Sequence, residues 1–462
     1  MITVEAQTTA VNRLAVFASG LRFEELPQSV RQRIPLMLTD LFGVTAAGAR
    51  TSDMAKLMGQ WPRDTGDAPI IGTDLTTTPE TAAYLNAISA CCLELDEGNK
   101  HARGHPAVHV VFAAVAATQR AGRPVSGQEF LTAIVAGYEV AARFGRAVRL
   151  DPGWHTHGHW GSAGAACAAA LIHGCSVEQI AASIDAATGL IHVTPWDMVL
   201  DGNFTRNLWA AGASTAGLHA VQLAKSGLVS NSGAAARTLG QLAGSLDTDL
   251  LTEQLGEFWL SAHGYSKWHA SCSYTHVAID IVQRLKREHL FGVEDIESVT
   301  VRTHSLAEPL FAGTATNRLS AMFSFPFVVA AALVNDAVSP GSMDPHSDSF
   351  KAATQFLPRI TTMLQPAFDA ALPSERWAEV EIRFKNGTIV SHAQPNPRGD
   401  ADYFPFRPED VEAKLVALIG SSGCTRMIEV VSELPTSPNT EMTLRNLTGA
   451  SSYTAELEPN DD

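Results

Sequence analysis

The densest group of ionisable side chains lies between residues 94 and 106. This segment contains Glu94, Asp96, Glu97, Lys100, His101, Arg103 and His105. It falls between an expected helix that ends near Cys92 and another that begins at Pro106, whose fixed φ suits a first helical turn. Loops held by rigid helices concentrate catalytic groups, and histidines and carboxylates are the usual proton carriers. The segment is therefore a candidate catalytic loop, with a solvated surface turn as the alternative.

Histidines gather in two short stretches and raise the question of a metal site. They are His101, His105, His109, His155, His157 and His159. Imidazole is a common zinc ligand. However, Pro106 means that the first three cannot be assumed to share one helical face, and neither a cysteine partner nor an H-E-x-x-H pattern accompanies them. We expect no bound metal and expect two or more of these histidines to be structural hydrogen-bonding groups, with a metal-dependent hydrolase as the alternative.

Two further basic residues could hold an anion. Lys267 stands among aromatic residues, where the sequence pattern changes from helical to a mixture of helices and strands. It could bind a carboxylate, or carry a proton if partly desolvated. Arg206 precedes an expected helix whose free amide groups favour anions. An ordinary surface lysine and an exposed arginine are the alternatives.

Composition limits the possible partners. The 462 residues carry a formal net charge of −15, so nucleic acid and anionic membranes are not expected to bind, and an anionic substrate needs a local basic pocket. Six cysteines without a Cys-x-x-Cys pair favour a reducing compartment. Residues 1–21 lack the layout of a signal peptide, and apolar runs fall short of the ~20 residues that span a bilayer. We therefore expect a cytoplasmic protein.

Helical periodicity dominates the first half of the chain. Apolar residues recur at helical spacing from Leu26 to Gly48, where Pro35 should kink or split the helix. Ser176 and Gln179 predict a capping box. Gly161 and Gly164 follow no strand, so they predict close helix packing rather than a nucleotide site. Other helices are expected at roughly 80–92, 107–121, 127–148, 160–174, 177–189 and 207–227.

The texture changes near Gly264 to a mixture of helices and strands. A helix is expected near 275–290, a strand at 296–303 and another helix at 327–336. Strands at 378–384 and 388–392 flank Asn386-Gly387, a strong hairpin signal. A helix is expected again at 411–419. The polar stretch after Pro435 is expected to be flexible at its end.

Four ordered blocks resemble the MmgE/PrpD family, whose members include 2-methylcitrate dehydratase, cis-aconitate decarboxylase and iminodisuccinate epimerase. The blocks are Leu26-Pro27 to Gly48, Glu94 to Pro106, Gly153-Trp154-His155 with Gly161 and Gly164-Ala165-Ala166, and Lys267 with Ser271-Cys272 and His276. The resemblance implies a mainly α fold and a homodimer. It implies a large all-helical domain of residues 1–267 and 401–462, a smaller α+β lid domain of residues 268–400, and an active site between them.

The resemblance also assigns roles to individual residues. The family's active-site histidines fall on His105 and His155, its lysine on Lys267, and its loop aspartate on Glu94 or Asp96. Two positions depart from the family pattern. Arg206 replaces a second lysine, and Phe327 replaces a tyrosine and so lacks a hydroxyl that could donate a proton.

The implied chemistry is removal or replacement of a group on the carbon next to a carboxylate, with no metal or organic cofactor. Such chemistry needs a base near the C–H bond and cations that stabilise the developing negative charge. We expect His105 and His155 to be the base and acid pair, and Asp96 to fix a histidine tautomer. Lys267 is expected to be the main carboxylate anchor. The further substrate-binding residues are expected to be Arg103, Arg206, Glu94, Lys100 and His276.

The first expectation for the reaction is a lyase that dehydrates a small di- or tricarboxylic acid, as 2-methylcitrate dehydratase does. Epimerisation is the alternative that these departures favour, because Asp96-Glu97-Gly98 replaces the Asp-Asp-Thr of the decarboxylase and dehydratase members and Phe327 replaces the tyrosine. Decarboxylation is a further alternative. A non-catalytic helical scaffold is a more remote alternative. Which histidine is the base is left open by the sequence.

Overall fold

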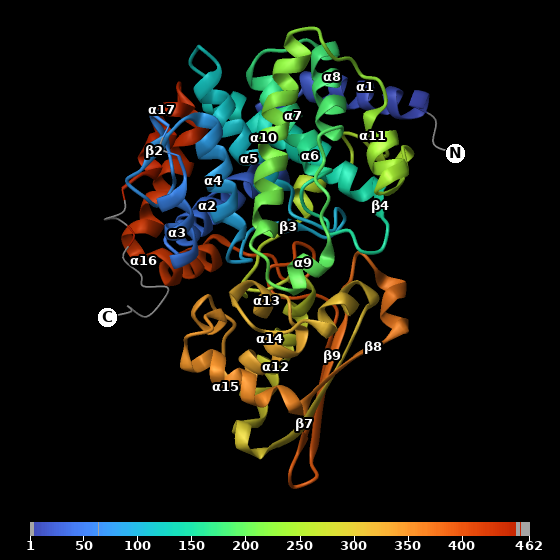
Figure 1. Cartoon of the computed structure of the whole chain (residues 1–462), viewed down its shortest axis with the longest axis vertical. Coiled ribbons are helices and arrows are strands. Elements are labelled where there is room, and N and C mark those ends of the chain that lie inside the picture. Colours follow the sequence, from blue (N-terminus) through green and yellow to red (C-terminus); the bar gives the residue numbers. More distant parts are fainter. Residues whose placement is uncertain (1–3, 63, 450–452, 454–462) are drawn as a thin grey trace.

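The protein consists of a large helical part and a smaller part of helices and sheet. The structure, a computed structural model, describes residues 4–62, 64–449 and 453. Helices from both ends of the chain form the upper part in Figure 1, and a four-stranded sheet with its helices extends below it. The predicted mainly α fold with a smaller α+β part is confirmed. The domain boundaries given above stay predictions.

Helices of the larger part follow the predicted periodicity closely. They are α1 Val4–Gly20, α2 Gln28–Ala49, α4 Pro79–Cys91, α5 Pro106–Arg120, α6 Gly127–Ala147, α7 Gly161–Ile172, α8 Val177–Thr188 and α10 Thr205–Lys225. Helix α2 continues through Pro35 instead of splitting there, and the capping box of Ser176 and Gln179 is confirmed. Short helices that the sequence did not predict are α3 Ser52–Gln60, α9 Trp196–Leu200 and α11 Ala234–Arg237.

Helix α7 lies at the centre of this part, in contact with α5, α6, α8 and α10. Its small residues allow that packing. A Cβ atom on Gly164 would lie 2.2 Å from the carbonyl oxygen of Gly137 in α6, and one on Gly161 would lie 2.3 Å from the ring of His109. These contacts confirm that the glycines serve close helix packing.

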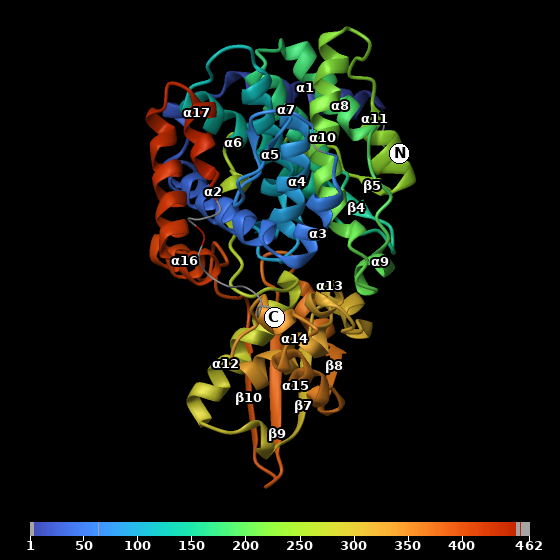
Figure 2. The same cartoon turned by 60° about the vertical axis from the view of Figure 1, so that its left-hand side comes forward.

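The C-terminal end of the chain returns to the larger part through α16, Pro408–Glu433, which packs on α2 (Figures 1 and 2). By length and composition, residues 408–436 are apolar enough to cross a membrane, but core helices of soluble proteins meet the same test. Gly420, with φ +77°, interrupts the helix. Short α17, Thr440–Leu444, follows within the polar C-terminal stretch, whose predicted flexible end at residues 454–462 lies outside the described residues.

The smaller part is built on a sheet in the order β10-β9-β7-β8. Its strands are β7 Ile296–Thr303, β8 Ile360–Leu364, β9 Ala378–Phe384 and β10 Ile389–Gln394. The predicted hairpin is confirmed, with Gly387 at φ +86° in the turn. Strand β8 lies parallel to β7 at the sheet edge and was not predicted, because its largely exposed residues lack an alternating pattern.

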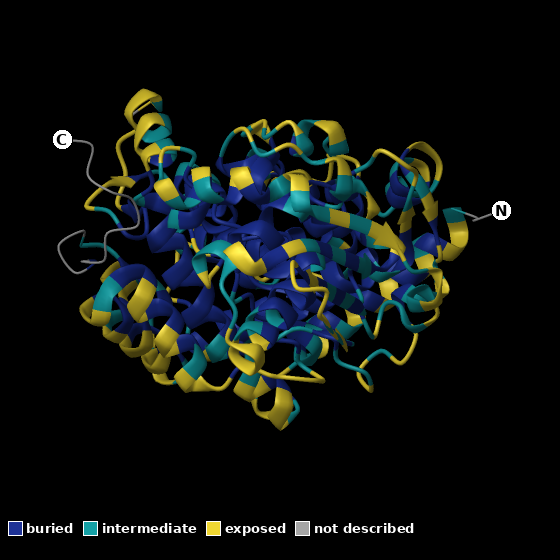
Figure 3. Cartoon of the chain, turned by 90° about the horizontal axis from the view of Figure 1, so that it is seen from below, coloured by how far each residue is buried: buried dark blue, intermediate teal, exposed yellow. Residues whose placement is uncertain are grey.

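Helices α12 His276–His289 and α14 Phe325–Asn335 pack against the strands, and α13 Arg318–Met322 and α15 Asp348–Phe356 complete this part. Seen from below, buried residues make up most of the interior, and exposed residues lie on the outer elements, both around the edge and on those that face the viewer (Figure 3). The chain crosses between the two parts twice. These two crossings run side by side, since the Ser266 amide donates to the Gly399 carbonyl at 3.0 Å.

Candidate active site

A cavity of about 430 Å³ lies where the loop of residues 94–105 meets the smaller part. Its wall includes residues of the 94–105 loop, of the 148–160 segment and of the 265–274 crossing, and Arg376 from the loop before β9. Much of the remaining wall is aromatic or aliphatic. Because both parts of the protein contribute side chains, the site depends on how the two are placed together.

The 94–105 loop is held by short strand pairing at the crossing of residues 265–274. Strand β3, Gly98–Asn99, pairs with β6, Gly264–Tyr265. Glu94 and Arg103 both have φ +53°, a conformation that costs non-glycine residues of order 1 kcal/mol or more and is found where surrounding structure enforces it. The loop is thus a constrained element, and it presents Glu94, Arg103 and His105 to the cavity.

His105 is paired with a buried carboxylate. Its Nδ1 lies 2.8 Å from Oδ2 of Asp96, which is fully buried behind it. Burial lowers the pKa of His105 despite the opposing attraction of Asp96. Burial alone would raise the pKa of Asp96, but His105 and the Lys267 ammonium outweigh it and hold that pKa below its usual range. The neutral ring therefore carries its proton on Nδ1 and offers an unprotonated Nε2, the arrangement of a general base.

His155 has the opposite tautomer. Its Nδ1 accepts a hydrogen bond from the backbone amide of His157 at 3.2 Å, which places the proton of the neutral ring on Nε2. Burial, and then the positive charge of Arg206, lowers the pKa of His155 well below its usual value. His155 thus lines the cavity as a neutral hydrogen-bond donor.

The other histidines of the two stretches are structural or pack against other histidines. His109 Nδ1 bonds the His105 carbonyl at 2.7 Å, and His159 Nε2 bonds the His155 carbonyl at 2.8 Å, which confirms the expectation of two or more structural histidines. The ring of His157 lies between those of His105 and His155, with centroid distances of 4.6 and 4.8 Å. His157 is therefore in ring contact with both of these cavity-lining histidines.

Glu94 lies between two cations. Its carboxylate accepts a hydrogen bond from Lys267 Nζ at 2.8 Å and forms an ion pair with Arg206. Arg206 reaches the cavity wall, whereas Lys267 is fully buried and is not part of that wall. The role expected for Lys267 as the main carboxylate anchor is not supported by this placement, because its charge is already matched by Glu94.

Lys100 and His276 lie away from the cavity wall, contrary to the substrate-binding role expected for them. Lys100 Nζ contacts Asp400 at 3.2 Å and Asp402 at 2.7 Å, and so ties the loop to the second crossing. His276 begins α12 and its Nε2 bonds the Ser271 carbonyl at 3.1 Å. Local sequence spacing could not reveal these contacts, since the acidic partners of Lys100 are about 300 residues away.

Phe327 also lies outside the cavity wall. It is completely buried in α14, and its ring centroid lies 4.5 Å from that of Phe350. The aromatic ring that reaches the cavity from this stretch is that of Phe323, beneath the guanidinium of Arg206 at 5.2 Å. The missing hydroxyl at residue 327 therefore removes no group from the cavity described here.

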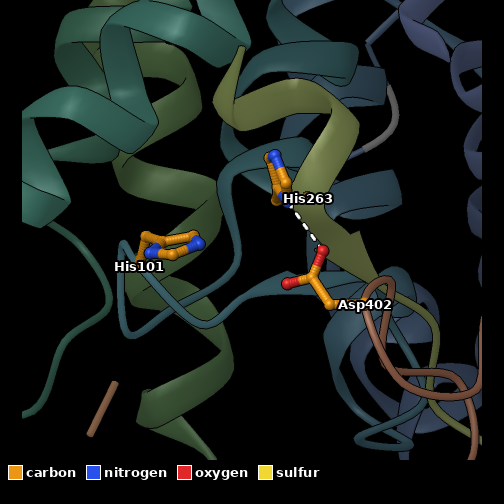
Figure 4. A group of neighbouring side chains, drawn as sticks. All are labelled: His101, His263 and Asp402. Atoms are coloured by element: carbon orange, nitrogen blue, oxygen red, sulfur yellow. Dashed lines mark hydrogen bonds and ion pairs between the residues drawn. The ribbon is translucent and has the colours of Figure 1, made fainter. Parts of the chain in front are cut away.

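One group of side chains has the composition of a cation site. Ligand atoms of His101, His263 and Asp402 lie within 4.8 Å of one another (Figure 4). However, Asp402 already bonds His263 Nδ1 at 2.9 Å and Lys100 Nζ at 2.7 Å. None of the three lines the cavity, so the group has no part in the chemistry proposed below.

Several functional candidates were not singled out from the sequence. Arg376, Tyr265 and Tyr274 line the cavity, and the Arg376 guanidinium lies 5.3 and 5.1 Å from the two tyrosine ring centroids. Trp196 packs against His155 with ring centroids 4.6 Å apart. No spacing pattern marks Arg376, because it precedes a strand in a stretch without other candidate residues.

Comparisons with known proteins agree with this picture. Residues 12–253 match the MmgE/PrpD N-terminal domain and residues 269–433 match the MmgE/PrpD C-terminal domain. The chain is 26% identical over 436 residues to cis-aconitate decarboxylase-like protein oryM of Aspergillus oryzae, covering 86% of this chain and 88% of that protein. It is 21% identical over 448 residues to cis-aconitate decarboxylase of Aspergillus terreus, covering 90% of each. The chain therefore belongs to the MmgE/PrpD family.

Proposed function

We propose that this protein is a lyase that dehydrates a small di- or tricarboxylic acid by histidine-mediated proton transfer, in the manner of 2-methylcitrate dehydratase. The observation that carries the proposal is the His105–Asp96 pair, with an unprotonated Nε2 at a cavity that also holds cationic side chains. A family whose relatives include cis-aconitate decarboxylases supports chemistry of the dehydratase or decarboxylase type.

In the proposed reaction His105 Nε2 removes the proton from the carbon next to a substrate carboxylate. Electron density moves onto that carboxylate, and the hydroxyl on the neighbouring carbon then leaves as water, taking the proton from the His105 imidazolium as the double bond forms. Asp96 keeps the His105 proton on Nδ1 and stabilises the imidazolium that results. Asp96 is a positioning residue, since it lies behind His105 and outside the cavity wall.

His155 acts in this scheme as a neutral hydrogen-bond donor. Its Nε2–H is suited to an oxygen that gains negative charge, because a donor aimed at developing charge in a site shielded from water stabilises the transition state. Arg206 supplies positive charge beside it, partly offset by Glu94. In this scheme His105 takes the proton, and His155 stabilises the oxygen that gains negative charge.

A single experiment separates dehydration from its alternatives. Purified protein is incubated in D2O with 2-methylcitrate, citrate, cis-aconitate and malate, and the products are followed by proton NMR. Dehydration of citrate or malate gives a new vinyl resonance in a product that keeps every carbon, and dehydration of 2-methylcitrate converts its methyl doublet to a singlet. Decarboxylation gives a product one carbon shorter, and epimerisation gives deuterium incorporation without loss of a group. We expect dehydration of at least one hydroxy acid, and its loss in His105→Asn. If every acid stayed unchanged and undeuterated, the proposal would be wrong.

A further inference from the structure

Arg376 is a buried cation without a carboxylate partner. It is 4% exposed and lies in the loop between the short helical turn Pro366–Ala371 and β9. Its Nη1 donates to Ser273 Oγ at 3.2 Å, whereas Nε and Nη2 are buried without a hydrogen-bond partner. Within the part of the chain that the structure describes, no carboxylate lies within ion-pair distance of it. Buried charges are ordinarily paired, so this arrangement is unusual for a purely structural arginine.

The guanidinium is held in place by its neighbours. It lies against the rings of Tyr265 and Tyr274, and its backbone amide bonds the carbonyl of Pro395 at 2.8 Å. Aromatic faces attract a cation and leave the edge of its planar fork free to bind a carboxylate with two parallel hydrogen bonds. Arg376 is thus oriented before any ligand arrives.

The other cations near the cavity are differently occupied. Lys267 and Arg206 share Glu94. Arg103 donates to the carbonyls of Gly145 and Val148 and has no carboxylate partner among the described residues. Burial lowers the pKa of Arg103, and the charges of Arg149 and Arg376 act in the same direction.

The charges around the cavity do not balance. Among the described residues, the charged groups on the wall itself are the cations Arg103, Arg206 and Arg376 and the carboxylate Glu94, an excess of two positive charges. Glu94 is the one acidic residue on the wall among those described. Arg206 and Arg376 are buried, and a buried excess of positive charge is unfavourable unless anionic groups enter the cavity.

We propose that Arg376 binds a carboxylate of the substrate and that the cavity is built for an acid with two negative charges. The substrate charge named here rests on the proposed function, whereas the binding role of Arg376 rests on its own contacts. Because Arg376 comes from the smaller part and Arg103, His105 and His155 come from the larger one, a bound dianion bridges the two. Arg376 therefore takes the anchoring role that the sequence assigned to Lys267.

The test compares anions that differ by one charge. Succinate, its monoamide succinamate and the triacid tricarballylate serve as probes, with binding measured by calorimetry and by the shift in melting temperature. The wild-type protein should bind succinate at least about tenfold more tightly than succinamate. Arg376→Gln should lose most of that difference and should not melt earlier when unliganded, because the change removes an unpaired buried charge. Arg376→Lys should retain part of the preference, since it keeps the charge but not the fork.

Arg383→Gln is the matched control, because Arg383 is an exposed arginine on β9 of the same part. It should bind all three acids as the wild type does. The proposal would be overturned if the wild type bound succinate and succinamate equally well. It would also be overturned if both Arg376 variants kept the wild-type preference for succinate. If Arg376→Gln does not fold, the Arg376→Lys result decides. Charge-dependent binding through Arg376 without turnover of any hydroxy acid would instead count against the dehydratase function alone.

Discussion

At the scale of single residues, two histidines of the same type are made chemically different by one hydrogen bond each. Asp96 accepts from Nδ1 of His105, and the amide of His157 donates to Nδ1 of His155. One ring consequently presents a lone pair at Nε2 and the other presents a proton. Which histidine is the base, a question that the sequence left open, is answered in the proposed mechanism by these partners.

The first prediction concerns the acidic limit of activity. A base must be unprotonated, and burial lowers the pKa of His105, so the specificity constant kcat/KM should decline only below pH 6.5. Asp96→Asn should move this limb to still lower pH, because it removes the anion that opposes the shift, and should reduce kcat/KM by about 10²–10⁴-fold. A pH profile of both proteins checks this. The control is Asp280→Asn, which alters the pair formed by His269 and Asp280, outside the cavity wall. It should leave the pH profile unchanged.

The second prediction concerns Glu97 and the pH dependence of stability. Burial raises the pKa of Glu97 from 4.5 to about 7. The folded state therefore binds a proton that the unfolded state has lost, and stability falls as pH rises from 4.5 to 7, by about 3 kcal/mol in total. Glu97→Gln should remove this loss, so its melting temperature should exceed that of the wild type increasingly between pH 5 and 8. The prediction would be contradicted if the melting temperatures of the two proteins changed equally with pH. The control is Glu379→Gln, at a partly buried glutamate of β9, which should leave the pH dependence of the melting temperature unchanged.

At the scale of elements, a buried ion pair joins helices from opposite ends of the chain. Lys414 Nζ in α16 lies 2.7 Å from Asp40 Oδ1 in α2 and also donates to the Leu95 carbonyl at 2.9 Å. Leu95 precedes Asp96 directly. Helix α16 thereby helps to hold the 94–105 loop in place, although its own residues do not reach the cavity wall.

The third prediction tests this support. Lys414→Met leaves the Asp40 carboxylate buried without a partner, and breaking such a pair costs about 3–5 kcal/mol. Urea unfolding should show that loss, and the double variant Asp40→Asn/Lys414→Met should recover much of it. Arg445→Ala removes ion pairs of an exposed arginine with Asp67 and Glu441 and should cost about 1 kcal/mol or less. A Lys414→Met variant as stable as Arg445→Ala would show that the buried pair is dispensable.

At the scale of the whole molecule, the two parts meet at a pair of crossings that also carry the site. The Ser266 amide bonds the Gly399 carbonyl, and Lys100 joins the 94–105 loop to Asp400 and Asp402 of the second crossing. Small changes at these crossings would alter the distance between Arg376 and the histidines. Substrate binding is therefore expected to be coupled to the relative placement of the parts.

The fourth prediction separates a structural Lys100 from a substrate-binding one. Lys100→Met leaves Asp400, which is 3% exposed, without its cation, so the melting temperature should fall by several degrees. Calorimetry with succinate should show a smaller loss of affinity than Arg376→Gln causes. Lys351→Met, at an exposed lysine of α15, should change neither property. A normal melting temperature with greatly weakened succinate binding would restore Lys100 to the substrate site.

The fifth prediction is the homodimer that the family resemblance implies. Light scattering on the purified protein should give the mass of two chains at micromolar concentration. A mass of one chain at every concentration measured would show that the expectation fails for this member of the family.

Local signals in the sequence were enough to predict most of the helices, the capping box at Ser176, the hairpin at Asn386-Gly387 and the loop that carries His105. Each depends on residues within a few positions of one another, so periodicity and turn chemistry reveal them. The tertiary structure decided which charged residues face the cavity. Lys267 meets Glu94 across 173 positions and is neutralised by it, while Arg376 reaches the cavity from another part of the fold and finds no carboxylate. Charge pairing over such separations depends on packing, and packing is not encoded in any short stretch of residues.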